Sequence, residues 1–200
     1  MRAMQRPNSR LVDTVPPIMQ TTARELRRLF GLQTTRNPQL ERLLLNDPAA
    51  AIAVFRALGQ IKPNAFETVS DATHAVSLIG REPLQAVIQS LPTLELDATS
   101  QSPRDTAASA YSQAAHAAHY ANALATRKKT SGNQAISTAA LLQQPAILAL
   151  WADQPESAQS ATNAVRDGVS FEQAFAAELG EPLEDVNWRL AEAWSLPLLA

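Results

Sequence analysis

The feature that most constrains the fold is a long alanine-rich segment, residues 105–126, which contains neither glycine nor proline. Alanine has the highest helix propensity, and its small side chain lets neighbouring helices pack closely. Elsewhere valines and aromatic residues are few, and apolar and polar residues do not alternate over any sustained run, so strands are not expected. The sequence therefore predicts an all-α fold.

Prolines, capping residues and glycines divide the rest of the chain into further helices. Two of the predicted starts are Asn37-Pro38 and Asp47-Pro48, in which a capping side chain precedes a first-turn proline. Helices are predicted from Pro16-Pro17 through Ile18 to Gly31, from Asn37 to Leu44, from Pro48 to Gly59, from a Thr68 or Ser70 cap to Gly80, from Pro83 to Leu91, and over about 105–129, 134–151, 155–167, 171–179 and 183–194. The helix over 134–151 should kink or break at Pro145.

A polar, proline-flanked segment, residues 92–104, interrupts this series of helices. Such a segment is typical of a connection between lobes. It predicts a single domain over 15–197, with an N-terminal helical lobe over about 15–95, a hinge over about 96–104 and a C-terminal lobe over about 105–197. Residues 1–14 are expected to form a flexible N-terminus.

Composition excludes several kinds of chemistry. The chain has no cysteine and three histidines, which excludes disulfides, thiolate metal sites and a cysteine nucleophile. Its six glycines form no phosphate-cradling loop, so the usual dinucleotide and nucleoside-triphosphate sites are not expected. No uninterrupted apolar run is long enough to span a membrane, and no secretory signal is visible. We therefore expect a soluble cytoplasmic protein without membrane contact.

Charge is distributed unevenly along the chain. Residues 1–62 hold ten Lys and Arg against four Asp and Glu, whereas residues 63–200 hold seven against fifteen. This polarity would steer a partner or align two copies head to tail. The simpler interpretation is attraction between the two ends of one compact domain.

Arg24, Arg27 and Arg28 share one face of a predicted helix, with Arg36 and Arg42 nearby. Clustered guanidinium groups bind phosphates, so this face is a candidate site for an anion or a nucleic acid. An ordinary solvated face is the simpler interpretation, because the segment lacks exposed aromatic residues that would stack on bases.

Histidines and tryptophans supply the other candidates. His116 and His119 lie one turn apart on a predicted helix, but a stable metal site needs at least a third ligand. Trp188 and Trp194 are six residues apart, so both cannot point straight inward on one helix. They are candidate contacts for a partner protein, with packing inside the domain as the alternative.

Several segments together resemble one known family. The first two are LLLNDPAAAIAVFRALGQ (43–60) and VSDATHAVSLIGREPLQAVI (69–88). Downstream the likeness continues through AYSQAAHAAHYANALA (110–125), ISTAALLQQPAILALW (136–151) and the closing DGVSFEQAFAAELGEPLEDVNWRLAEAWSLP (167–197). In this order the segments resemble the HDOD family, the HD-related output domains. The resemblance implies a C-terminal HD-like bundle over the predicted second lobe.

The resemblance also implies a degenerate metal site. In the related HD phosphohydrolases a His and a His-Asp pair bind metals, and the His-Asp position falls on Gln143-Gln144. The earlier helix histidine falls on or near Gln113, and a later one near Pro182 or Leu183. Because glutamine amides are neutral and weak metal ligands, we expect no metal, no cofactor and no catalytic residue.

Members of the family often continue past the W-x-L-P motif into a further helix. If such a helix is missing from this chain, the bundle face near Trp194 would be open to a partner or a second copy. The function implied is a non-catalytic bacterial signalling module that works through protein–protein contacts. Two alternatives stay open: nucleotide or nucleic-acid binding through the arginine face, and an atypical phosphohydrolase using His116, His119 and a distant carboxylate.

Overall fold

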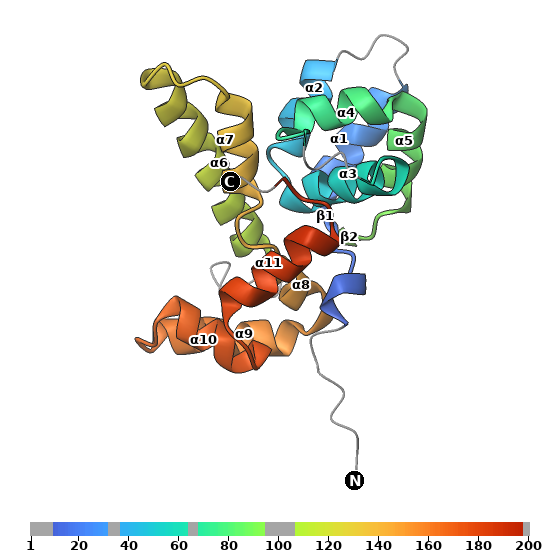
Figure 1. Ribbon diagram of the computed structural model, residues 1–200. Helices are drawn as coiled ribbons and strands as arrows, with labels where there is room; N and C mark the ends of the chain where they lie inside the picture. The colour runs from blue at the N-terminus through green and yellow to red at the C-terminus, as the bar shows by residue number, and fades with distance from the viewer. Residues whose placement is uncertain (1–9, 32–36, 64–67, 95–106, 198–200) are drawn as a thin grey trace.

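The computed structural model describes residues 10–31, 37–63, 68–94 and 107–197. These residues are helical almost throughout (Figure 1), which confirms the predicted all-α class. The helices of the first half are α1 (Gln20–Gly31), α2 (Asn37–Leu44), α3 (Pro48–Ile61), α4 (Ala72–Ile79) and α5 (Arg81–Ser90). Those of the second half are α6 (Ala107–Arg127), α7 (Asn133–Leu141), α8 (Pro145–Asp153), α9 (Pro155–Arg166), α10 (Phe171–Leu179) and α11 (Leu183–Ala193).

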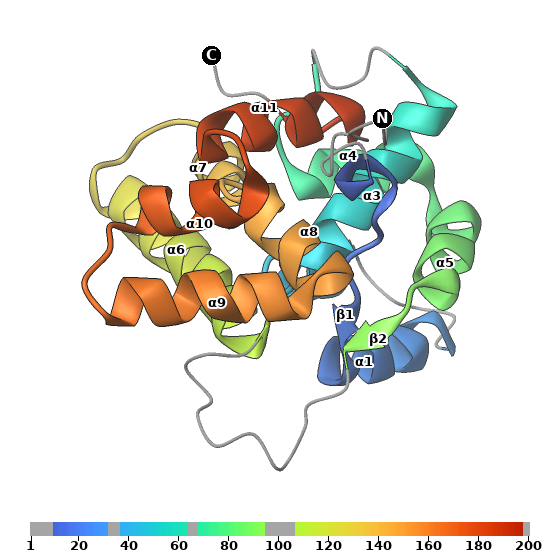
Figure 2. The same ribbon diagram turned by 90° about the horizontal axis from the view of Figure 1, so that it is seen from below.

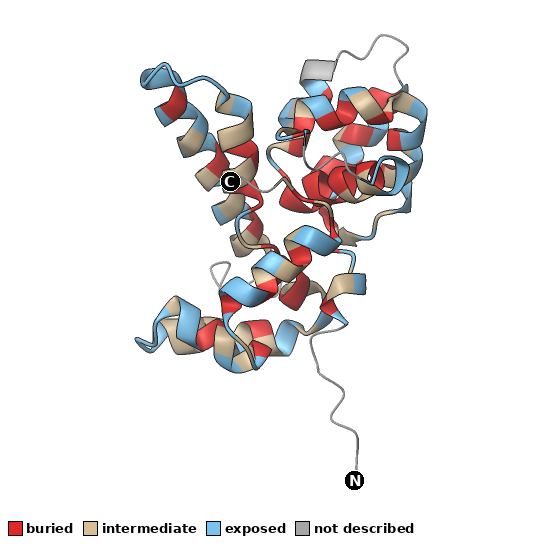
Figure 3. Ribbon diagram, viewed as in Figure 1, coloured by how far each residue is buried: buried red, intermediate tan, exposed pale blue. Residues whose placement is uncertain are grey.

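The helices form three groups. Helices α1–α5 pack together, α6 and α7 form a hairpin beside them, and α8–α11 form a third group next to both (Figures 1 and 2). Helix α3 is buried on nearly every side from Pro48 to Phe55, as Figure 3 shows in red. A helix that is apolar all round is stable only inside a core, so α3 is the element around which the first group packs.

Two short strands correct the expectation of a strand-free chain. Ile18–Met19 (β1) pairs in parallel with Thr93–Leu94 (β2), and the Ile18 amide donates to the Pro92 carbonyl at 2.9 Å. The first helix therefore begins at Gln20, after Ile18, and not at Pro16-Pro17. Pro17 and Pro92 directly precede the two strands, and proline, which lacks an N–H, is tolerated at the first residues of short edge strands.

The predicted caps and breaks agree with the structure at most of these helix ends. Asp47 caps α3 with its side chain, as expected, and Ser170 caps α10 in the same way. Helix α4 is capped by Asp71 and not by Thr68 or Ser70, because the Asp71 carboxylate accepts from the His74 amide at 2.8 Å. The break before Pro145 is confirmed, since α7 ends at Leu141 and α8 begins at Pro145.

Two other predicted boundaries are wrong. Helix α5 begins at Arg81 and not at Pro83, so the proline lies inside its first turn. Helix α3 continues past Gly59 to Ile61. Glycine at 59 serves close packing: a Cβ atom there would lie 2.1 Å from the Ser195 Oγ atom.

The N-terminal boundary also needs correction. Residues 11–13 form a short 3-10 helix, η2 (Leu11–Asp13), and the Leu11 side chain is fully buried. This turn packs on α8 and α11, so residues 11–14 belong to the folded domain and not to a flexible terminus. Directly after this turn, the Thr14 carbonyl accepts from the Arg56 guanidinium of α3, so the N-terminal segment contacts both predicted lobes. The predicted hinge over 96–104 lies outside the described residues.

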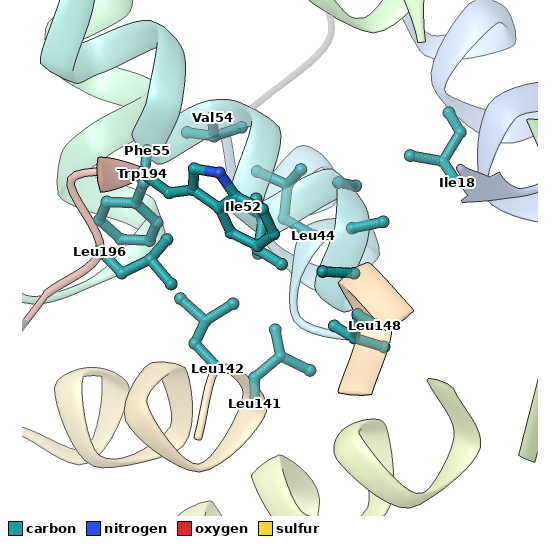
Figure 4. Close-up of a cluster of buried hydrophobic side chains, with 14 of the residues drawn as sticks. Ile18, Leu44, Ile52, Val54, Phe55, Leu141, Leu142, Leu148, Trp194 and Leu196 are labelled. Carbon is teal, nitrogen blue, oxygen red and sulfur yellow. The ribbon is translucent and has the colours of Figure 1, made fainter. Parts of the chain in front are cut away.

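One core joins the two halves of the chain. Figure 4 shows side chains of the first half, such as Ile52 and Phe55, lying against Leu142, Trp194 and Leu196 of the second. Trp194 is 1% exposed and is among the largest fully buried side chains. The predicted lobes are therefore two parts of a single packed unit.

Among the described residues, one stretch, Asn133–Asp153, has the length and apolar composition of a membrane-spanning helix. It is interrupted between α7 and α8, and 56% of its most apolar window is buried inside the protein. These are properties of core helices, which bury apolar surface against the rest of a domain.

Candidate functional site

Gln143 and Gln144 lie in the turn between α7 and α8, where the resemblance placed a His-Asp pair. Gln143 is exposed and Gln144 is half-buried. Gln144 precedes Pro145, and its backbone (φ −133°, ψ 61°) lies outside the helical region, which proline disfavours for the residue before it. The first turn of α8 is capped from another helix: the Asn187 side chain of α11 accepts from the Ala146 amide at 2.9 Å. This cap fixes α8 against α11 at the edge of a groove.

The groove next to these glutamines has a volume of about 430 Å³ and is bounded by the α7–α8 turn, α11 and the chain after it. Its floor and walls include Leu142, Pro145, Leu183, Ala191, Leu196 and Pro197. Glu172 and Glu184 also line it, and none of its lining residues, all of them described, is a Lys or Arg. Trp188 stands at the same groove with 56% of its surface exposed. The groove is thus apolar inside and acidic at its edge.

A nearby arginine does not offset this acidity. The Arg189 guanidinium donates to both carboxylate oxygens of Glu181, at 2.5 and 3.0 Å. The hydrogen bonds that Arg189 donates to Glu181 are the main reason that the pKa of Arg189 is raised. The charges of Arg189 and Glu181 neutralise each other, so Arg189 does not cancel the negative charge of Glu172 and Glu184 at the groove.

The structure does not bring Gln113 together with Gln143 and Gln144. Gln113 lies on α6 beside a separate hollow of about 70 Å³, and its amide donates to the Ser109 hydroxyl at 3.4 Å. That hollow is lined mainly by apolar side chains, among them Ile147, Trp151, Val165, Phe171 and Phe175. The three glutamines therefore do not face one common cavity that would hold a metal.

The side chains that surround these positions do not fit a divalent metal. Within the described residues, no three His, Asp or Glu side chains lie close enough to hold one together. His116 and His119 are exposed on α6, and each ring lies near the Tyr120 ring, with centroids 6.5 and 6.2 Å apart. Pro182, where a late histidine was expected, caps α11, and Leu183 is buried.

The predicted arginine face lies on the exposed side of α1. Arg24, Arg27 and Arg28 are all exposed, and the Arg28 Nε atom donates to Glu25 at 2.9 Å. None of the three lines the groove beside Trp188 or the hollow beside Gln113. Arg36 lies outside the described residues. Anion binding at this face stays a prediction.

The two tryptophans differ in exposure, and the prediction that Trp194 contacts a partner is wrong. Trp194 is buried, and its indole N–H donates to the Val12 carbonyl at 2.7 Å. It is covered by this chain itself, so Trp194 is not available as a partner contact, whereas Ala191, Leu196 and Pro197 near it line the groove beside Trp188. Trp188 projects into solvent and stays a candidate contact.

Sequence reasoning missed what Asp47 does beyond capping. Its second oxygen accepts from the Met19 amide at 2.7 Å, which ties β1 to the start of α3. The carboxyl is completely buried, and this burial raises its pKa despite hydrogen bonds from Met19, Ala50 and Thr22. A D-P pair predicts a cap, but no local signal predicts a partner 28 residues away.

Comparison with known proteins agrees with this architecture. A model of the HDOD domain matches residues 16–199, which is nearly the whole chain. The chain belongs to the HDOD family. No curated protein matches it significantly.

Solved structures show the same fold at low identity. The MmoQ response regulator from Methylococcus capsulatus str. Bath superposes with a TM-score of 0.71 at 17% identity, covering 93% of this chain and 73% of that one. A second crystal structure of the same protein, its fragment 20–298, gives a TM-score of 0.70 at 18% identity, covering 92% and 70%. The HDOD fold is therefore kept although few residues are shared.

Proposed function

We propose that this HDOD domain is a non-catalytic signalling module of the bacterial cytoplasm that binds a partner protein at the groove beside Trp188. Membership of the HDOD family supports the link to signalling, as does the likeness to a protein described as a response regulator. The observation that carries the proposal is the exposed Trp188 at an apolar, acid-edged groove.

The non-catalytic part of the proposal rests on the chemistry of the degenerate positions. Metal-assisted hydrolysis needs ligands that hold the ion and lower the pKa of its bound water. Gln143 and Gln144 offer neutral amides, and Gln113 faces a different hollow. These residues do not fit a metal, so no hydrolytic step is assigned to them.

The binding part rests on the shape and charge of the groove. Tryptophan is enriched among residues that dominate binding energy, because it buries a large rigid surface. Leaving Trp188 more than half exposed beside an apolar groove is costly unless a partner covers it. The acids Glu172 and Glu184 favour a partner segment that combines an apolar anchor with a Lys or Arg.

Metal content and activity test the first part. The untagged protein, purified without chelators, should contain far less than one equivalent of transition metal and should not hydrolyse phosphate esters when Mn²⁺ or Mg²⁺ is added. One equivalent of metal, with hydrolysis that disappears in Gln143→Ala, Gln144→Ala or His116→Ala, would show that the domain is an enzyme.

Capture with matched variants tests the second part. Immobilised wild-type protein and the variants Trp188→Ala and Leu124→Ala are compared for the proteins that they retain from bacterial lysate. Leu124 is the control because it is an equally exposed apolar residue, at 58%, on a different helix, α6. Proteins retained by wild type and Leu124→Ala but lost by Trp188→Ala are expected. Equal retention by Trp188→Ala would place the contact elsewhere.

A further inference from the structure

A second cavity lies between the first group of helices and the α6–α7 hairpin, away from the Trp188 groove. It has a volume of about 420 Å³. Figure 1 shows the hairpin beside the first group of helices, where α6 contacts α3 and α7 contacts α4. One wall is Arg42, Leu45 and Asn46, and the other is Ala115, Ala118, His119, Asn122 and Ser137.

The charged and polar groups of this cleft come from both walls. Arg42 lies at the end of α2 and His119 in the middle of α6, so two nitrogen-rich side chains face one space from different helices. All of the lining residues are described, and none of them is an Asp or Glu. Arg42 thus gives the cleft a permanent positive charge that none of the lining residues neutralises.

Amides and a hydroxyl add neutral hydrogen-bonding groups. Asn46 and Asn122 present side chains that both donate and accept. Ser137 is 3% exposed and donates its hydroxyl proton to the Ala118 carbonyl at 3.0 Å. Because this bond uses the hydroxyl proton, the oxygen is left as an acceptor, which suits a hydroxyl or amine of a ligand.

The remaining lining is apolar, and the cleft is larger than a bare anion needs. Leu45, Ala115 and Ala118 supply a surface on which an uncharged organic group can lie. Pockets for small organic molecules have volumes from about 300 Å³ upward and combine apolar walls with a few polar groups. The dimensions and lining of this cleft match that description.

We propose that this cleft binds a small organic phosphate about the size of a mononucleotide. The guanidinium of Arg42 pairs with two phosphate oxygens, since its planar donors match that geometry. His119 donates to the same group from the opposite wall, and the organic part lies on the apolar surface next to Asn46, Asn122 and Ser137. A ligand held in this way contacts α2 and the α6–α7 hairpin together, and gives the signalling module a chemical input separate from its protein-binding groove.

Calorimetric titration of the full chain tests this site. The probes are adenosine monophosphate, glucose 6-phosphate and inorganic phosphate, with adenosine and glucose as the matched compounds that lack phosphate. At least one phosphate ester should bind saturably and at least tenfold more tightly than both inorganic phosphate and its own unphosphorylated parent. Equal binding of ester and parent, or no saturable binding of either ester at millimolar concentration, would overturn the proposal.

Single substitutions test whether the phosphate ester binds in this cleft. Arg42→Gln should weaken the binding of the ester at least tenfold and His119→Gln severalfold, and both residues are exposed, so the fold should survive. Arg24→Gln is the matched control, because Arg24 is an exposed arginine of α1 that does not line the cleft. Unchanged affinity in Arg42→Gln would overturn the proposal, and a loss in Arg24→Gln alone would move the site to the α1 face. Trp188→Ala should bind the ester normally, which separates this test from that of the protein-binding groove.

Discussion

The indole N–H of Trp194 donates to the carbonyl oxygen of Val12 at 2.7 Å, a hydrogen bond between residues 182 positions apart. The Arg56 guanidinium lies 5.3 Å from the centre of the same indole ring and donates to the Thr14 carbonyl at 2.5 Å. Partial burial lowers the pKa of Arg56, and Asp13 offsets part of this effect. The two ends of the domain and the central helix α3 thus meet at one tryptophan.

Replacing Trp194 by Phe should destabilise the domain by about 2 kcal/mol. The change removes the hydrogen bond to Val12 and leaves a cavity where the larger ring was. Urea unfolding followed by circular dichroism measures the loss. The control is Trp188→Phe, which should stay within about 0.5 kcal/mol of wild type because that side chain is exposed. Equal effects of the two changes would contradict the role given to Trp194.

Gly59→Ala should destabilise the domain by about 1–3 kcal/mol, although Ala normally stabilises a helix interior by about 1 kcal/mol relative to Gly. The added Cβ would lie 2.1 Å from the Ser195 Oγ atom and 2.6 Å from the Ser195 Cβ atom. Because a Cβ atom moves only with its backbone, the C-terminal turn would have to shift. Thermal or urea unfolding of the variant shows whether its free energy of unfolding is lower or higher than that of wild type.

Ser195→Gly supplies the matched background for this test. Ser195 has a φ of 55°, a conformation that glycine adopts without strain, so the single change should be tolerated. It also removes both atoms with which the new Cβ would overlap. In this background Gly59→Ala should become neutral or stabilising, so the double-mutant cycle should give a coupling of about 1–3 kcal/mol. Additive effects would contradict the close approach of the two backbones.

Asp47→Asn should destabilise the domain by about 1–3 kcal/mol at pH 4, because an amide nitrogen would face the half-buried Met19 N–H and that donor would lose its partner. Burial raises the pKa of Asp47, so the folded state holds this proton more tightly than the unfolded state. Wild-type stability from this group should therefore fall as pH rises above about 3.8 through the raised pKa. The cost of the substitution should shrink from pH 4 to pH 7 in urea unfolding. A cost that grows with pH would mean that the pKa is lowered instead.

Tyr111→Phe should destabilise the domain by about 1 kcal/mol, since the Tyr111 hydroxyl donates to the Pro17 carbonyl at 2.5 Å, next to β1. Burial and the nearby Asp47 raise the pKa of Tyr111, so the hydroxyl keeps its proton at every pH below its ordinary value of 10. The loss should therefore be the same at pH 6 and pH 9. Tyr120→Phe, at a residue 65% exposed, is the control and should have little effect.

The local signals in the sequence were sufficient for most helices. Alanine content, the caps Asp47 and Ser170, and the break before Pro145 act over a few residues, so they can be read without knowing the neighbours in space. The pairing of β1 with β2 could not be predicted from local sequence signals. It joins residues 75 positions apart, and each strand has only two residues, too few for any periodic pattern.

At the candidate site, too, some features follow from the sequence and others depend on the tertiary structure. Glutamines at 143 and 144, and the surplus of acids in the second half, follow from the sequence alone. Only the tertiary structure separates Gln113 from the other two glutamines, buries Trp194 while exposing Trp188, and places Arg42 and His119 across one cleft. Residue type and helix propensity are properties of short segments, whereas burial and the meeting of distant side chains depend on how the whole set of helices packs.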